Sequence, residues 1–171
     1  MALLVILSGC IVAIGQNSFD RNKFEGKWIL DRGKSSENIS IIQGQEVLQI
    51  SYTAPHFKIE KSQTRSNDSR SATLTLFTDK RGERNKPFPF DAQREISSTS
   101  AWEQEALVRS YLMENSVKGG RPQEIPAREV YRLSKDGMAL TVVDEMLLPP
   151  EANIASARRQ VISKRVYRRG N

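Results

Sequence analysis

Short runs in which apolar and polar residues alternate dominate this sequence, and this period of two constrains the fold more than any other feature. Between residues 47 and 53, Leu48, Ile50 and Tyr52 fall on one face of an extended chain, and polar residues fall on the other. Such a run predicts a half-buried β-strand, because successive side chains of a strand point to opposite sides of the sheet. The 3.6-residue stripe of an amphipathic helix is scarcely present.

The same alternation recurs along the chain, and polar or turn-forming residues bound each run. Two pairs of runs predict β-hairpins, one with its turn at 103–105 and the other at 134–137. The second turn contains Asp136-Gly137, which provides the positive φ that a tight turn between strands requires. The predicted strands after 47–53 are 57–60, 73–76, 96–102, 107–114, 129–133, 140–143 and 161–167.

With residues 24–31 at the head of the series, this pattern gives nine or ten short strands in about 155 residues and predicts an all-β fold. A sheet with so many strands normally curls and closes, because closure removes the unpaired backbone groups of its two edges. We therefore expect a single antiparallel up-and-down β-barrel of eight to ten strands. The 171 residues suffice for one domain with its own hydrophobic core.

The N-terminal segment differs from the rest, because residues 2–15 (ALLVILSGCIVAIG) contain no charge. It is shorter than the roughly 20 residues of a transmembrane helix but matches the apolar core of a secretory signal. Ala13 and Gly15 provide the small side chains that a signal peptidase requires near its cut. We expect residues 1–15 to be a cleaved signal peptide and residues 16–171 to form the barrel domain of a secreted or periplasmic protein.

A second interpretation of this segment is an acylation site at Cys10. Leu7-Ser8-Gly9-Cys10 resembles the lipobox of bacterial lipoproteins, in which a lipid on the cysteine anchors the protein to a membrane. However, no Lys or Arg precedes the motif, and apolar residues follow it where a lipoprotein normally has a polar tether. We therefore favour the cleaved signal over an anchor at Cys10.

The chain offers little of the chemistry that enzymes use. It has one Cys and one His, which excludes a zinc site built on these residues. His56 lies between two predicted strands, so we interpret it as an exposed turn residue. We expect Glu103, Glu105, Asp144 and Glu145 to be solvated, because nothing in the sequence predicts the burial that would separate their pKa values. We expect no enzyme, no catalytic residue, no metal ion and no cofactor.

Basic residues are in excess, with 26 Lys and Arg against 20 Asp and Glu and a formal net charge of +6. A nucleic-acid platform would interleave aromatic side chains with them, and only Tyr167 does so near the C-terminus; we expect no nucleic-acid partner. A last strand rich in Lys and Arg is typical of a protected sheet edge. Weak attraction to an anionic envelope surface is the alternative. The C-terminal basic residues are Arg158, Arg159, Lys164, Arg165, Arg168 and Arg169.

Three segments carry a resemblance to a known family. Residues 24–31 (FEGKWILD), followed by Lys34-Ser35, resemble the opening strand of bacterial lipocalin-like secreted proteins, relatives of the lipocalin and fatty-acid-binding barrels. Residues 101–108 (AWEQEALV) resemble the tryptophan hairpin of that family, and residues 131–142 (YRLSKDGMALTV) resemble its late hairpin. The resemblance covers residues 20–168 and implies an up-and-down barrel with an apolar cavity and no catalytic residues.

The sequence departs from the family pattern at two points. The family often has a glycine where this chain has Gln104. The arginine that packs over the first tryptophan of a lipocalin is not assigned by the sequence, and Arg165 is a candidate.

These observations predict an exported, monomeric, lipocalin-like barrel that binds a small apolar or amphipathic molecule. The alternative is a structural or interaction module of the cell envelope without such a ligand, which contacts an anionic surface through its basic C-terminal strand. A cavity of at least about 300 Å³ would favour ligand binding, whereas a barrel filled by side chains would favour the module. The side chains that we expect to line the barrel interior and bind the ligand are Trp28, Tyr52, Phe57, Leu74, Leu76 and Trp102.

Overall fold

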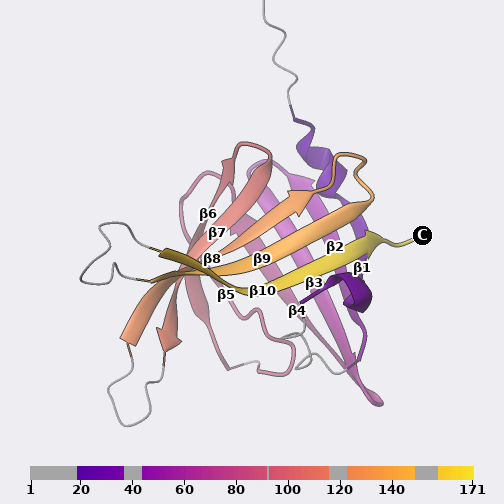
Figure 1. The fold of residues 1–171 in the computed structure, drawn as a ribbon, viewed down its shortest axis with the longest axis horizontal. Coiled ribbons are helices and arrows are strands. Elements are labelled where there is room, and N and C mark those ends of the chain that lie inside the picture. The colour runs from indigo at the N-terminus through magenta and orange to yellow at the C-terminus, as the bar shows by residue number, and fades with distance from the viewer. Residues whose placement is uncertain (1–18, 37–43, 92, 116–122, 149–157) are drawn as a thin grey trace, which may run out of the picture.

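Ten antiparallel strands curl into one nearly closed up-and-down barrel in the computed structural model of the protein (Figure 1). The strands follow one another around the sheet in the order β4-β3-β2-β1-β10-β9-β8-β7-β6-β5. The expected all-β class and barrel architecture are thereby confirmed. The structure describes residues 19–36, 44–91, 93–115, 123–148 and 158–171.

The described strands have between 3 and 12 residues, and one short 3-10 helix lies on each side of the first strand. The first five strands are β1 (Gly26–Leu30), β2 (Glu46–Thr53), β3 (His56–Arg65), β4 (Asp68–Phe77) and β5 (Glu83–Asn85). The last five are β6 (Ile96–Glu103), β7 (Ala106–Asn115), β8 (Gln123–Leu133), β9 (Ala139–Leu148) and β10 (Arg158–Arg169). The two 3-10 helices are η1 (Arg21–Phe24) and η2 (Arg32–Lys34). Neither of them has the length and hydrophobicity that a helix needs to cross a bilayer.

Both hairpins that the sequence predicts are present. In the turn between β6 and β7, Gln104 has a φ of 55°. Glycine adopts this left-handed conformation without a steric penalty, which is a physical reason for the glycine that the resembled family often has at this position. In the turn between β8 and β9, Gly137 has a φ of 70°, and the Ala139 amide donates to Ser134 Oγ at 2.9 Å.

Several strands extend beyond the ranges expected from hydrophobic alternation. Strands β3 and β4 pair from His56 and Phe77 as far as Arg65 and Asp68. Their distal halves carry polar residues on both faces, so hydrophobic periodicity could not detect them. They are held instead by continuous backbone pairing with the neighbouring strand.

Strand β10 is not an edge. It pairs with β1 on one side, where Trp28 faces Arg169, and with β9 on the other, where Val166 faces Thr141. The prediction that the basic C-terminal strand is a protected sheet edge is therefore wrong. The physical reason is barrel closure, which places the last strand beside the first and leaves β4 and β5 as the two ends of the sheet.

Side chains of β5 close the seam between β4 and β5. The Asn85 side chain accepts a hydrogen bond from the Thr75 amide at 2.7 Å and donates one to the Thr75 carbonyl at 3.0 Å. Glu83 Oε2 accepts from the Phe77 amide at 3.3 Å. These side chains satisfy backbone groups of β4 that a neighbouring strand would otherwise pair.

Aromatic side chains fill the end of the barrel beside η1. Trp28 is fully buried, and its Nε1 donates to the Phe24 carbonyl at 2.8 Å. The guanidinium of Arg169 lies 4.6 Å from the Trp28 ring centroid, and its Nη2 donates to the Lys23 carbonyl at 2.6 Å. Arg169, rather than the candidate Arg165, is thus the arginine that packs over the first tryptophan.

Candidate functional site

A cavity of about 240 Å³ lies within the barrel, bordered by inward-facing side chains and by the connection between β5 and β6. This volume is below the roughly 300 Å³ that we took as favouring ligand binding. Side chains nonetheless do not fill the whole barrel: they pack closely at the aromatic end, and the cavity lies beyond them. The apolar side chains that border the cavity include Leu48, Ile59, Leu74, Ile96, Val142 and Ile162, with Pro87 and Phe88 from the connection.

The six side chains that the sequence assigned to the interior occupy two different places. Leu74 borders the cavity. Trp28, Phe57 and Leu76 are fully buried in the core. Tyr52 and Trp102 are partly buried and pack against this core, with their ring centroids 5.8 Å apart. Contact of these residues with a ligand stays a prediction.

Charged side chains form one wall of the cavity. They were not predicted from the sequence. Six strands each contribute one inward-facing charged side chain. Each of these side chains lies on the same face of its strand as the buried apolar residues, because residues two apart in a strand point to the same side. Arg109, for example, alternates with the buried Leu107, and Arg165 with the buried Tyr167. The six are Glu46 (β2), Lys61 (β3), Arg109 (β7), Glu129 (β8), Asp144 (β9) and Arg165 (β10), and we call them the internal charge cluster.

Arg165 lies at the centre of the internal charge cluster. Its Nη2 is 2.7 Å from Glu129 Oε1 and 3.0 Å from Asp144 Oδ2. Asp144 also accepts a hydrogen bond from the Ser163 hydroxyl. The guanidinium therefore bridges the carboxylates of two adjacent strands, and an arginine side chain suits this because its donors point in several directions in one plane.

Arg109 is less completely satisfied. Its Nε donates to Ser98 Oγ at 2.9 Å, and its Nη1 lies 3.5 Å from Glu129 Oε2. Its Nη2 is buried and has no hydrogen-bond partner among the described residues, and the same holds for Arg165 Nε. Both arginines border the cavity. The site thus presents unused donors in a protein interior, where an unpaired polar group is costly.

The internal charge cluster shifts the pKa values of its acids in opposite directions. Burial would raise the pKa of Glu129, but the charges of Arg165 and Arg109 outweigh it and lower this pKa to about 2. Burial raises the pKa of Asp144, because Arg165 offsets it only in part and the charge of Glu129 adds to it. Lys61, 3.2 Å from Glu46, together with Arg165 overcomes burial and lowers the pKa of Glu46. Glu129 and Glu46 are therefore anions at neutral pH.

Tyrosine hydroxyls complete the polar wall. Tyr131 donates to Glu129 Oε2 at 2.7 Å, and Tyr167 donates to Glu46 Oε1 at 2.5 Å. Burial and the neighbouring carboxylates raise the pKa of both hydroxyls well above the usual value, so both remain donors. No group of three or more His, Cys, Asp or Glu side chains among the described residues is placed to hold a metal ion.

The expectation that Asp144 and Glu145 are solvated is wrong, because their side chains are only 20% and 18% exposed and each pairs with an arginine. The two side chains point to opposite faces of β9. Asp144 belongs to the internal charge cluster, whereas Glu145 pairs with Arg128 at 2.8 Å on the outer face. Glu103 and Glu105 are exposed, as expected. His56 is exposed at the start of β3, with its ring 5.3 Å from that of Phe77.

A signal for the internal charge cluster was present in the sequence. Arg109 stands between Leu107 and Tyr111, and Glu129 stands two residues before Tyr131, so each occupies an inward position of an alternating run. A charged residue at such a position has to find a partner from another strand. The sequence could have identified these residues as buried charges, but it could not have identified their partners.

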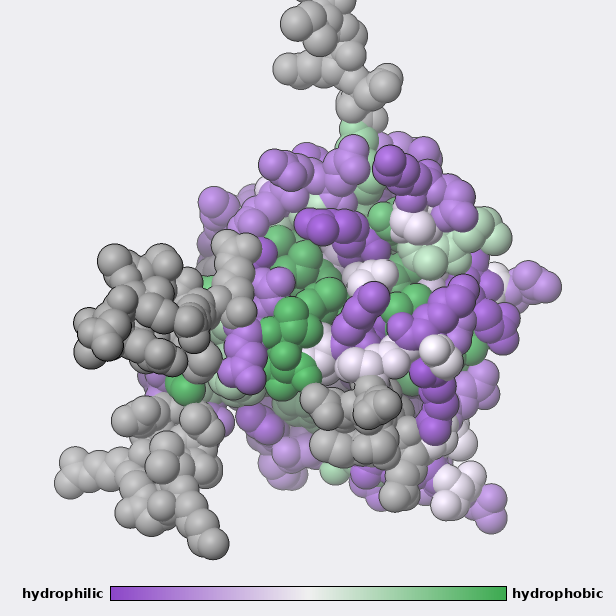
Figure 2. All heavy atoms as spheres, viewed as in Figure 1, coloured by the Kyte–Doolittle hydropathy of each residue, from purple (hydrophilic) through white to green (hydrophobic). Residues whose placement is uncertain are grey.

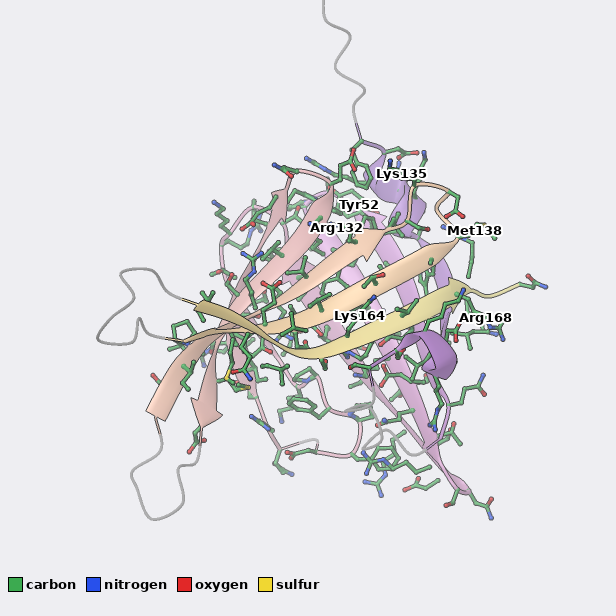
Figure 3. All side chains as sticks on the ribbon, in the orientation of Figure 1. Tyr52, Arg132, Lys135, Met138, Lys164 and Arg168 are labelled. Carbon is green, nitrogen blue, oxygen red and sulfur yellow. The ribbon has the colours of Figure 1, made fainter. Side chains whose placement is uncertain are left out.

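The outer face of β8, β9 and β10 is largely hydrophilic, with apolar residues gathered in one area (Figure 2). Lys164 and Arg168 are exposed on β10 and point away from the barrel, and Arg132 and Lys135 lie on the same side of the molecule (Figure 3). Of the six C-terminal basic residues, Arg165 belongs to the internal charge cluster, and the half-buried Arg169 packs over Trp28. The side chains of Arg158 and Arg159 lie outside the described residues.

Comparison with solved structures confirms the barrel type. No protein-family model and no curated protein sequence matches the chain. A structure named REP1-NXSQ fatty acid transporter matches with a TM-score of 0.54 and 12% identity, over 86% of this chain and 96% of that one. A tyrosine-to-phenylalanine mutant of the same transporter matches with a TM-score of 0.52 and 12% identity, over 85% of this chain and 97% of that one.

A third solved structure shares the same fold. The secretary abundant heat soluble (SAHS) protein from Ramazzottius varieornatus matches with a TM-score of 0.54 and 13% identity, over 89% of this chain and 98% of that one. At these identities the matches establish a common β-barrel fold and nothing finer. The fold that the family resemblance implied is therefore confirmed, whereas its bacterial and secreted character stays a prediction.

Proposed function

We propose that this protein binds a small amphipathic molecule inside its barrel. The observation that carries the proposal is the cavity itself, which is bordered by apolar side chains from several strands and by Arg109, whose Nη2 is buried and unpartnered among the described residues. A mostly apolar cavity with a few convergent polar groups is the usual form of a small-molecule site. The apolar walls favour a hydrocarbon portion, and the unused donor favours an oxygen-bearing head group.

The size of the cavity limits the ligand. At about 30 Å³ for a water-sized group, 240 Å³ accommodates about eight such groups. A chain of roughly that many carbon atoms fits, whereas a longer chain would extend past the connection between β5 and β6. The description of one structural neighbour as a fatty acid transporter supports this class of molecule, a hydrocarbon chain with a polar end.

A substitution that fills the cavity tests the proposal. Val142 is buried and borders the cavity, whereas the next residue, Val143, faces the outside of the same strand. We expect the parent protein and Val143→Phe to bind 1-octanol or octanoate in a calorimetric titration and Val142→Phe to lose that binding. Thermal melting of both variants checks folding, and Ile96→Phe, at a half-buried position of the cavity wall, replaces Val142→Phe if the latter does not fold.

Two results would contradict the proposal. One is the absence of binding of both octyl compounds to the folded parent protein. The other is equal binding by the parent protein and a folded cavity-filling variant, which would place the binding outside the barrel.

We also propose that the protein is exported. The support is the uncharged segment 2–15 and the small residues Ala13 and Gly15, as set out above. The segment lies outside the described residues, and so does Cys10, the site of the alternative lipid anchor.

A further inference from the structure

The charges beside the cavity are balanced before any ligand enters. Each cation of the internal charge cluster has a carboxylate within reach: Lys61 is 3.2 Å from Glu46, Arg109 is 3.5 Å from Glu129, and Arg165 is 2.7 Å from Glu129. Arg165 is also 3.0 Å from Asp144. The cluster therefore comprises three cations and three anions, and its formal charge is zero when all six are ionised.

Two further charged side chains lie near the cavity, and neither adds a buried positive charge that could attract an anionic ligand. Glu83 is buried and accepts hydrogen bonds from the hydroxyls of Ser98 and Ser100, and Ser98 in turn accepts from Arg109. It adds negative charge. Arg94 borders the cavity but is exposed, so water and salt screen its charge. Among the described residues that border the cavity, no buried cation lacks a carboxylate partner.

A carboxylate head group would enter this balanced site at a cost. It would lose its hydration and would approach Arg109 and Arg165 in the presence of Glu129 and Asp144, which already use these guanidinium groups. The result is a buried, uncompensated negative charge, which is unfavourable in a medium of low polarity.

An uncharged head group avoids that cost. Arg109 and Arg165 border the cavity, and Arg109 Nη2 and Arg165 Nε are buried without a partner among the described residues. An acceptor oxygen that reaches either nitrogen would therefore satisfy a hydrogen bond that is otherwise unmade. An amide carbonyl or an alcohol oxygen can accept from them without changing the charge of the site. We infer that the cavity selects amphiphiles with an uncharged, hydrogen-bond-accepting head group, such as a primary amide or an alcohol, over carboxylates. This inference rests on the proposed function and specifies its ligand class.

Octanamide and octanoate provide a matched test, because they differ in charge but have the same number of non-hydrogen atoms. We expect the parent protein at pH 7.5 to bind octanamide at least about tenfold more tightly than octanoate in a calorimetric titration. Equal or tighter binding of octanoate would overturn the inference and leave the proposed function standing. Binding of neither compound would overturn the proposed function and the inference with it.

A charge substitution tests the cause of the selectivity. Asp144→Asn removes one negative charge from the internal charge cluster with little change in shape, so we expect octanoate to bind about tenfold more tightly and octanamide to change by less than about threefold. The control is Glu145→Gln, which removes the adjacent carboxylate on the outer face and should leave both affinities unchanged. An unchanged ratio of affinities in folded Asp144→Asn would contradict the role of the charge balance.

The pH dependence of the parent protein provides a test that does not depend on a variant. If the site accepts octanoate only together with a proton, octanoate binding should weaken by about tenfold for each pH unit between pH 6 and 8, while octanamide binding stays constant. Tight octanoate binding that is independent of pH over this range would overturn the inference.

Discussion

Removing the guanidinium at the centre of the internal charge cluster should destabilise the protein strongly. We consider Arg165→Met, which keeps an unbranched apolar side chain in place of a buried, charged one. The substitution leaves Glu129 and Asp144 without the partner that lies 2.7 Å and 3.0 Å away, respectively. Breaking a buried ion pair in this way typically costs about 3–5 kcal/mol, a large share of a usual stability of about 5–15 kcal/mol.

The pKa of Glu129 reflects the whole internal charge cluster. Burial raises this pKa, but the charges of Arg165 and Arg109 and the hydrogen bond from Tyr131 outweigh burial and lower it from 4.5 to about 2. The net effect corresponds to roughly 3 kcal/mol in favour of the ionised form, at about 1.4 kcal/mol for each pKa unit, and Arg165 provides only part of it.

The contribution of Glu129 to the pH dependence of stability should differ in sign between the two proteins. In the parent protein the folded-state pKa of Glu129 is lowered, so its contribution is present above pH 4.5 and is lost as the pH falls toward 2. In Arg165→Met, burial without the guanidinium should raise the folded-state pKa values of Glu129 and Asp144. Protonation then relieves the buried charges, and the stability difference between parent and variant should shrink as the pH falls from 7 to 4.

Urea denaturation at pH 7, 5.5 and 4 measures this difference. The control is Lys164→Met on the same strand, whose side chain is exposed and which should change the free energy of unfolding by less than about 0.5 kcal/mol. The reasoning would be refuted if Arg165→Met were as stable as the parent protein at pH 7, or if the stability difference between them did not depend on pH.

Four further outcomes are expected. Trp28→Ala should lower the free energy of unfolding by about 3–5 kcal/mol, because it empties the packed end of the barrel; an unchanged thermal melting curve would contradict this. Asn85→Ala should cost about 1–3 kcal/mol by leaving a backbone amide and carbonyl of β4 unpaired, and faster amide exchange confined to β4 should accompany it. N-terminal sequencing of the exported protein should begin near Gln16; a full-length chain or a lipid on Cys10 would refute the cleaved signal. Binding to anionic vesicles should be weak at low salt and nearly absent at physiological salt. Tight, salt-resistant binding that Arg168→Gln abolishes would instead support the envelope-contact module.

The amino-acid sequence by itself determined the class of fold and the central part of most strands, but not β5 or the distal halves of β3 and β4. The period-two pattern assigned Leu48 and Ile50 to the inner face of one strand, and both are buried. Asp136-Gly137 specified a tight turn, which the structure contains. These features are local, because a strand's facing and a turn's dihedral angles depend on residues that are close in the chain. The barrel could be predicted from the number of strands, since closure pairs the backbone groups that the two edge strands of an open sheet would expose.

Only the tertiary structure decided which inward-facing side chains meet. Arg165, Tyr167 and Arg169 all fall on the inner face of β10, so the period of two cannot tell which arginine covers Trp28 and which bridges Glu129 and Asp144. Pairing of β10 with both β1 and β9 fixes the height of each residue in the barrel and places Arg169 opposite Trp28. The internal charge cluster arises from the same registers, because its members come from six different strands. Alternation determines the face of a strand, but only the register between strands determines the neighbours on that face.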